Sequence, residues 1–246
     1  MIFLTGDTHA EFGRFNTKLF PEQREMGLDD YVIICGDFGG LWNESKEQLW
    51  WRKWLSQKPY TTLFIDGNHE NFDRLNALPV EEWHGGKTHA IAPNIRHLMR
   101  GQVFDLHGLR IFTFGGARSH DIQDGILDPE APGFQAKLHA LRRRNAHFRI
   151  KDISWWEQEM PDKAEYAEGL WNLEDAGWKV DVILTHCAPE SLRLAMGKHE
   201  TDDLTVYLEE IRQKCKYKNW YFGHYHDDRD LSEKDHLLYE RIVRIV

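Results

Sequence analysis

Three short runs of apolar residues in the first part of the chain have the pattern of buried strands. They cover residues 1–4, 31–35 and 61–65, and each ends at a turn that carries glycine with threonine or aspartate. Runs this short and this apolar are typical of strands that are covered on both faces. Between the second and third runs, residues 44–57 place leucines and tryptophans at helical spacing. This alternation of strands and helices predicts a β/α architecture.

The pattern changes to shorter strands from about residue 89 to residue 116. Residues 103–106 and 110–114 flank a turn at His107-Gly108, which predicts a hairpin. Helical spacing returns over residues 135–146, 163–176 and 204–215, and strands are expected at 180–184, at 219–222 and twice within 236–246. Because no repeat and no interdomain linker interrupts the chain, we expect one domain over residues 1–246.

Composition narrows the class of protein. The chain has 246 residues, 41% of them hydrophobic, and includes ten tryptophans, which is ample material for a globular core. No apolar run approaches the ~20 residues that a membrane span needs. Cys35, Cys187 and Cys215 form no C-x-x-C pair, so we interpret them as reduced thiols of a cytoplasmic protein. A formal net charge of -9 argues against an extended nucleic-acid surface.

Metal-binding residue types follow the predicted strands with unusual regularity. The positions are Asp7, His9, Asp37, Asn68, His69, His186, His224 and His226. Strand ends of an α/β sheet gather at one edge, so these residues are expected to meet in one pocket. Imidazole combined with carboxylate and amide oxygen suits two borderline or hard divalent cations. Two such ions about 3.5–4 Å apart activate a shared water as a nucleophile, and one carboxylate must bridge them.

These residues resemble the motifs of the calcineurin-like metallophosphoesterases. In that family the blocks run D-x-H, G-D, G-N-H-[DE], a lone histidine and G-H-x-H. This chain has D-T-H at 7–9, G-D at 36–37, G-N-H-E at 67–70, T-H at 185–186 and G-H-Y-H at 223–226. Position 10 is alanine, where the family commonly has glycine, and the block at 36–40 lacks the Asp-Arg-Gly continuation of the Ser/Thr protein phosphatases.

The resemblance implies a fold and a set of roles. The fold is α/β, a four-layer α/β/β/α sandwich with two mixed β-sheets. The implied ligands are Asp7, His9 and His226 for the first ion, Asn68, His186 and His224 for the second, and Asp37 as the bridge. His69 is implied to protonate the leaving-group oxygen or to stabilise the transition state. Manganese is the expected metal, with iron, zinc, nickel and cobalt as alternatives.

Residues 117–160 are expected to form a lid or a substrate-specificity segment over the pocket. At its start, Arg118 or His120 could donate hydrogen bonds to a substrate phosphate, the alternative being an ordinary glycine-rich turn. Trp155 and Trp156 could stack on a nucleobase or simply pack. The basic residues of this segment could form an anion-binding patch on the lid or simply a solvated helix end; they are Arg142, Arg143 and Arg144, with Arg149 and Lys151 nearby.

The function expected from these features is hydrolysis of a phosphate ester by a metal-bridging hydroxide, with His69 assisting the leaving group. A phosphodiester, such as one in a nucleotide, is the first choice of substrate. A phosphomonoesterase acting on a small molecule or a protein is the alternative within the same chemistry. A non-catalytic scaffold on the same fold is the alternative from another class of protein.

Overall fold

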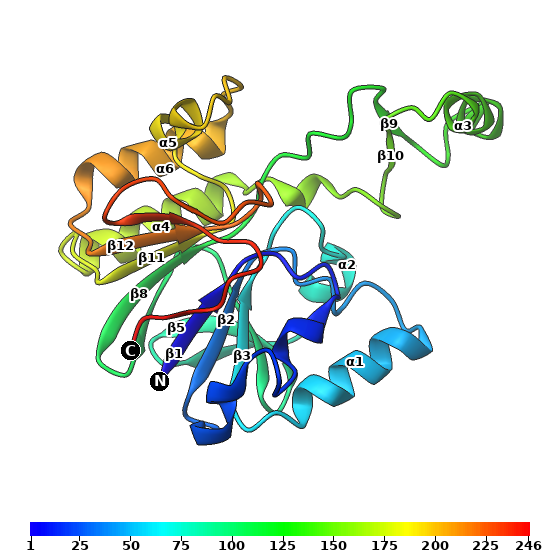
Figure 1. The fold of residues 1–246 in the computed structure, drawn as a ribbon. Coiled ribbons are helices and arrows are strands. Elements are labelled where there is room, and N and C mark those ends of the chain that lie inside the picture. Colours follow the sequence, from blue (N-terminus) through cyan, green and yellow to red (C-terminus); the bar gives the residue numbers. More distant parts are fainter.

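The computed structural model describes residues 1–246, which build two large mixed β-sheets with helices packed around them (Figure 1). The strand order of the seven-stranded sheet is β15 (Val243–Arg244), β1 (Ile2–Thr5), β2 (Tyr31–Cys35), β3 (Thr61–Ile65), β6 (Ile95–Leu98), β5 (Gly86–Ala92), β4 (Val80–Trp83). The six-stranded sheet has the order β13 (Arg229–Asp230), β14 (Asp235–Leu237), β12 (Asn219–Phe222), β11 (Val182–Thr185), β8 (Leu109–Phe114), β7 (Gln102–Leu106). The expected α/β class with two mixed sheets is confirmed.

Each sheet is parallel in its centre and antiparallel at its edges. Strands β1, β2, β3 and β6 run parallel in the first sheet, as do β8, β11, β12 and β14 in the second. Side chains alternate between the two faces of a strand. Thus Ile2 and Leu4 share one core cluster with Val182 and Leu184 of the other sheet. This shared cluster fills the space between the sheets and brings their carboxyl edges together.

Most of the helices cover the faces that point away from this shared core. The six helices are α1 (Lys46–Ser56), α2 (Phe72–Asn76), α3 (Phe134–Arg143), α4 (Lys163–Asp175), α5 (Glu190–Ala195) and α6 (Asp203–Lys214), and the 3-10 turns are η1 (Phe12–Phe15), η2 (Pro21–Glu25) and η3 (Glu157–Glu159). Leu55 of α1 packs with Phe3 of β1, and Leu208 of α6 packs with Ile183 of β11. Asp162 and Asp202 start α4 and α6 with capping boxes. None of the helices is both long enough and apolar enough to cross a membrane.

The predicted elements agree with the structure where the apolar pattern was strong. The strands expected at 31–35 and 61–65 match β2 and β3, and the expected hairpin is the antiparallel pair β7 and β8. His107 and Gly108 both have positive φ, 53° and 73°, as its tight turn requires. The prediction missed β4, because its residues Val80–Trp83 are largely exposed and carry no apolar alternation.

Residues 121–150 form a projecting arm that stands away from both sheets (Figure 1). Within it, β9 (Ile126–Leu127) pairs in parallel with β10 (Arg149–Ile150), and α3 lies at the outer end. Leu127, Leu138 and Leu141 make a small core cluster that involves no residue of either large sheet. At its base the Asp124 N–H donates to the His147 carbonyl at 2.8 Å. The arm is therefore a separately packed excursion whose two ends meet at its base.

Candidate metal centre

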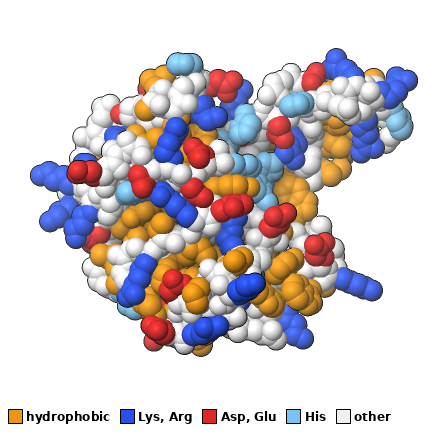
Figure 2. All heavy atoms as spheres, in the orientation of Figure 1, with side chains coloured by type: hydrophobic (Ala, Val, Ile, Leu, Met, Phe, Trp, Pro, Cys, Tyr) orange, Lys and Arg blue, Asp and Glu red, His pale blue; other side chains and the backbone are white.

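The candidate ligands lie at the carboxyl ends of strands from both sheets. The seven-stranded sheet contributes Asp7 and His9 after β1, Asp37 after β2, and Asn68 with His69 after β3, and the six-stranded sheet contributes His186 after β11 and His224 with His226 after β12. The expectation that all of these residues lie at the edge of one sheet is therefore wrong, because both sheets contribute them. Histidine side chains gather in the hollow between the arm and the body of the molecule (Figure 2).

A first group of polar atoms converges around Asp7. His226 Nε2 lies 3.2 Å from Asp7 Oδ2, and His9 Nε2 lies 3.9 Å from the same oxygen. The two imidazole Nε2 atoms are only 3.0 Å apart. Asp7 Oδ2 is buried and has no hydrogen-bond partner, which is rare for a buried carboxylate oxygen. A cation bound by these three side chains would satisfy that oxygen.

A second group converges around His186. Its Nδ1 lies 2.8 Å from the Cys35 carbonyl oxygen, which can only accept, so Nδ1 carries the hydrogen and the lone pair is on Nε2. That Nε2 atom faces Asn68 Oδ1 at 3.2 Å and Asp37 Oδ1 at 3.4 Å. When Nε2 is unprotonated, three acceptor atoms point at one another, and either a proton or a cation must lie between them. Burial lowers the pKa of His186, but the carboxylates of Asp37 and Asp7 outweigh burial and raise it to about 10. Without a metal ion, a proton on Nε2 therefore takes the place that a cation would occupy.

Asp37 lies between the two groups and turns one oxygen to each. Its Oδ2 is 3.6 Å from His9 Nε2, whereas its Oδ1 faces His186 and accepts a hydrogen bond from the His69 backbone N–H at 2.7 Å. The side chain is 1% exposed. Burial raises the pKa of Asp37, but His186, His69 and His9 outweigh it and hold the pKa far below its usual range. A buried, ionised carboxylate shared by two ligand groups is the arrangement that two cations require.

His224 is placed less directly than the other candidates. Its ring lies edge to face against the His186 ring at 5.0 Å, and its backbone N–H donates to Asp7 Oδ1 at 2.9 Å. Burial and the neighbouring His186 hold the pKa of His224 well below its usual value, so its imidazole is neutral and has a lone pair to offer. His224 therefore lies next to the second group, but it contacts that group through the edge-to-face packing of its ring and not through a hydrogen bond of a ring nitrogen.

The backbone that presents these side chains is strained. Four candidate ligands have positive φ, His9 at 45°, Asp37 at 48°, His224 at 70° and His226 at 50°. Such values are uncommon for residues other than glycine, and they cluster at functional sites. Ala10 follows with a φ of 64°, a conformation that a glycine would adopt without this cost.

Two glycines in the motifs provide space next to the carboxylates. A Cβ atom at Gly67 would overlap Asp37 Oδ1, and one at Gly223 would overlap Asp7 Oδ1. Neither glycine has a positive φ, whereas Gly36 does, at 98°. Gly67 and Gly223 are therefore needed because a side chain there would collide with a carboxylate, whereas the positive φ of Gly36 allows a sharp turn.

His69 lies beside the first group, with its ring 5.2 Å from that of His9. Burial lowers the pKa of His69, Asp37 opposes this effect and Arg149 adds to it. An Arg149 guanidinium nitrogen is 3.5 Å from His69 Nε2, and Arg149 is also paired with Asp121. The sequence grouped Arg149 with the basic residues of the lid. Its contact with His69 could not be read from spacing, because 80 residues separate the two.

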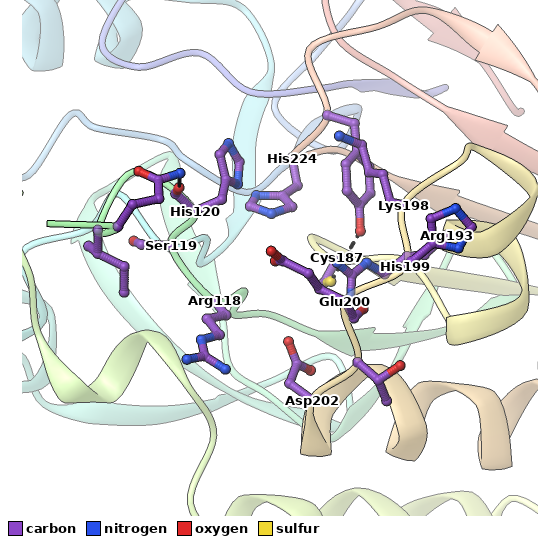
Figure 3. A pocket seen from close by; sticks show the side chains of 14 residues that line it. Arg118, Ser119, His120, Cys187, Arg193, Lys198, His199, Glu200, Asp202 and His224 are labelled. Atoms are coloured by element: carbon purple, nitrogen blue, oxygen red, sulfur yellow. Dashed lines mark hydrogen bonds between the residues drawn. The ribbon is translucent and has the colours of Figure 1, made fainter. Parts of the chain in front are cut away.

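A cavity of about 750 Å³ opens next to His224 (Figure 3). Arg118 and His120 both line it, and the His120 ring lies 5.0 Å from the His224 ring. Lys198 and Arg193 add positive charge to its wall, and Glu200 and Asp202 add negative charge. Trp156 is instead only 2% exposed and donates to Asp73 at 2.8 Å, so its role in packing is confirmed.

Comparison with known proteins agrees with this geometry. Residues 1–228 match the family described as calcineurin-like phosphoesterase. The chain belongs to this family. Membership gives its reaction class, the hydrolysis of phosphate esters, and implies a dimetal centre, with which the two converging ligand groups are compatible.

Within this calcineurin-like family, several relatives are lariat debranching enzymes. The human enzyme is 31% identical over 92% of this chain and 42% of its own length. The mouse enzyme is 31% identical over 52% of this chain and 25% of its own length, and lariat debranching enzyme A of Xenopus laevis is 30% identical over 52% and 26%. The chain spans less than half the length of these relatives.

Proposed function

We propose that this calcineurin-like phosphoesterase is a dimetal phosphodiesterase. The observation that carries the proposal is the position of Asp37, whose two oxygens face two separate groups of ligand atoms. Asp7, His9 and His226 would hold one ion, Asn68, His186 and His224 the other, and Asp37 would bridge them. Two divalent cations bound there supply Lewis-acid chemistry, activating water near neutral pH and neutralising charge on the phosphoryl group. Manganese is our first choice of metal.

The surroundings of the centre favour a diester as substrate. A diester has organic groups on both sides of its phosphate, and the centre is bordered by a cavity at His224 and by a basic side chain at His69. The cavity with Arg118 and His120 adjoins His224, and Arg149 of the arm contacts His69. We propose that residues 117–160 act as the lid, and that Arg118 or His120 donates hydrogen bonds to the substrate. A phosphodiester is also consistent with the relatives that are lariat debranching enzymes.

The direct test compares diester and monoester substrates. Metal-depleted protein is given Mn²⁺, Zn²⁺, Ni²⁺ or Mg²⁺ and assayed with bis(p-nitrophenyl) phosphate, with p-nitrophenyl phosphate and with a dinucleotide. We expect metal-dependent cleavage of both diesters, with a lower KM for the dinucleotide because it can reach the cavity and the lid. Faster turnover of the monoester would instead establish the phosphomonoesterase alternative.

His69 is proposed to donate a proton to the departing oxygen, because it lies beside the first ligand group and is not part of it. General acid catalysis contributes about 10²–10⁴-fold to a rate, and it matters most when the leaving group is a poor one. We therefore expect His69→Ala to reduce kcat strongly with the dinucleotide, whose leaving group is an alkoxide, and only weakly with bis(p-nitrophenyl) phosphate.

The matched control is His84→Ala, an exposed histidine in the turn between β4 and β5. It should leave kcat unchanged with both substrates. An equal loss for both leaving groups in His69→Ala would contradict proton donation and would indicate stabilisation of charge in the transition state.

A further inference from the structure

Behind Asn68 lies a relay of two buried polar side chains that the proposed mechanism does not use. Asn68 Nδ2 donates to Ser119 Oγ at 3.2 Å, and Ser119 Oγ donates to Glu159 Oε2 at 2.5 Å. The Ser119 backbone N–H donates to the other oxygen, Glu159 Oε1, at 2.9 Å. The three residues are 5%, 5% and 1% exposed in that order. Resting on the assignment of Asn68 as a ligand, we propose that Glu159 acts through Ser119 to fix which atom of the Asn68 amide faces the metal.

The order of donors and acceptors carries this inference. An ionised carboxylate can only accept hydrogen bonds. Glu159 Oε1 accepts from the backbone, so the single hydroxyl hydrogen of Ser119 points to Oε2. Only lone pairs of Ser119 Oγ remain for Asn68, so Asn68 must turn its NH2 group toward Ser119. Its Oδ1 then faces His186 Nε2, at 3.2 Å, where a cation needs an oxygen.

The alternative amide orientation has the same shape but the opposite polarity. With the amide turned over, the NH2 group would point at the cation position, and two acceptor oxygens would face each other at Ser119. Partners of this kind behind metal ligands are worth about 10–100-fold in metal affinity. Glu159 is a positioning residue in this sense, since it makes no contact of its own with a ligand atom.

The relay also fastens the lid segment to the centre. Ser119 lies near the start of residues 117–160 and Glu159 near their end, and a second bond joins the same two stretches, from Ala117 N–H to the Glu159 carbonyl at 3.2 Å. The base of the lid is thereby tied to a ligand of the second ion group.

The test exploits the fact that Glu159→Gln preserves shape and reverses the relay. The Ser119 N–H still needs an acceptor, so the new amide places its NH2 group at Ser119 Oγ. The Ser119 hydrogen then turns to Asn68, whose amide has to turn over to accept it. Burial raises the pKa of Glu159, so the metal-free protein is titrated with Mn²⁺ near about pH 8, well above the ordinary carboxyl pKa. The affinity for one of two ions should be reduced about 10–100-fold. The matched control, Glu157→Gln on the exposed side of the same turn, should bind both ions normally.

Ser119→Ala and the double variant separate positioning from general loss of structure. Ser119→Ala should weaken the same ion less than Glu159→Gln does, because the Asn68 amide is then free rather than reversed. Glu159→Gln added to Ser119→Ala should cost no further affinity. A full additional loss in the double variant, or unchanged affinity in both single variants, would overturn the relay. If Glu159→Gln does not fold, Ser119→Ala decides alone, since normal binding of both ions would overturn the relay.

Asn68→Ala distinguishes this inference from the function beneath it. If Asn68→Ala weakens metal binding and Glu159→Gln does not, only the relay is wrong. If Asn68→Ala leaves metal binding intact, the proposed ligand set is wrong, and the relay falls with it.

Discussion

Asp37→Asn should reduce kcat by at least about a thousandfold, even at saturating Mn²⁺. A metal pair contributes several kcal/mol of charge stabilisation, and about 4 kcal/mol corresponds to a factor of a thousand. The amide keeps the shape of the side chain but has a single acceptor oxygen. That oxygen stays where the His69 N–H donates, at 2.7 Å, so the NH2 group takes the position of Oδ2 and faces His9. The ion of the Asp7, His9 and His226 group should therefore be lost first.

Metal content and turnover are measured on the same preparation. We expect the bound metal to fall from two ions to one in Asp37→Asn, with thermal stability of the metal-free protein little reduced. Asp29→Asn makes the same chemical change at an exposed side chain and should retain two ions and full turnover. Two retained ions together with turnover within about tenfold of the parent would refute Asp37 as the bridge, since a lost bridge costs several kcal/mol.

Much of the centre could be predicted from the sequence because its chemistry is local. Each candidate ligand follows a short apolar strand, and strand and candidate ligand are neighbours in the chain, as with Ile65 and Asn68. Those strands are buried on both faces, so their apolar runs are unmistakable. The strained backbone at His9 and Asp37 could not be predicted, because the residue types there do not announce a positive φ.

The parts that could not be predicted depend on contacts between distant residues. Glu159 reaches Ser119 across 40 positions, and Arg149 reaches His69 across 80. Each contact depends on how the arm and the residues that flank it pack against the sheet edges. The periodicity of apolar residues does not predict that packing. The exposed strand β4 was missed for a related reason, since its pairing with β5 positions it and its own side chains do not.

Asp66 belongs to the same class, because the sequence presents it only as part of a turn after β3. In the structure it is 1% exposed and holds the loop that carries Asn68 and His69. Arg100 donates to Asp66 Oδ2 from Nε at 2.9 Å and from a terminal nitrogen at 2.6 Å, and His97 Nε2 lies 3.1 Å from Oδ1. Burial alone would raise the pKa of Asp66, but Arg100 and His97 outweigh it and keep the pKa well below its usual range.

Arg100→Ala should consequently lower the free energy of unfolding by about 3–5 kcal/mol, because it leaves a buried carboxylate without its main partner. Urea denaturation of the metal-free protein at pH 7 measures this loss. Arg96→Ala, in the preceding strand, removes an arginine whose partner Glu81 is 47% exposed, and it should cost no more than about 1 kcal/mol.

The pH dependence follows from the lowered pKa of Asp66. Its pairing stabilises the fold fully above the unfolded pKa of about 3.9, and this contribution disappears as the pH falls toward the lower folded pKa. The difference between parent and Arg100→Ala should therefore narrow below about pH 4. A difference that stays constant from neutral to acid pH would show that Arg100 stabilises the protein through packing of its stem, and that the ion pair contributes little.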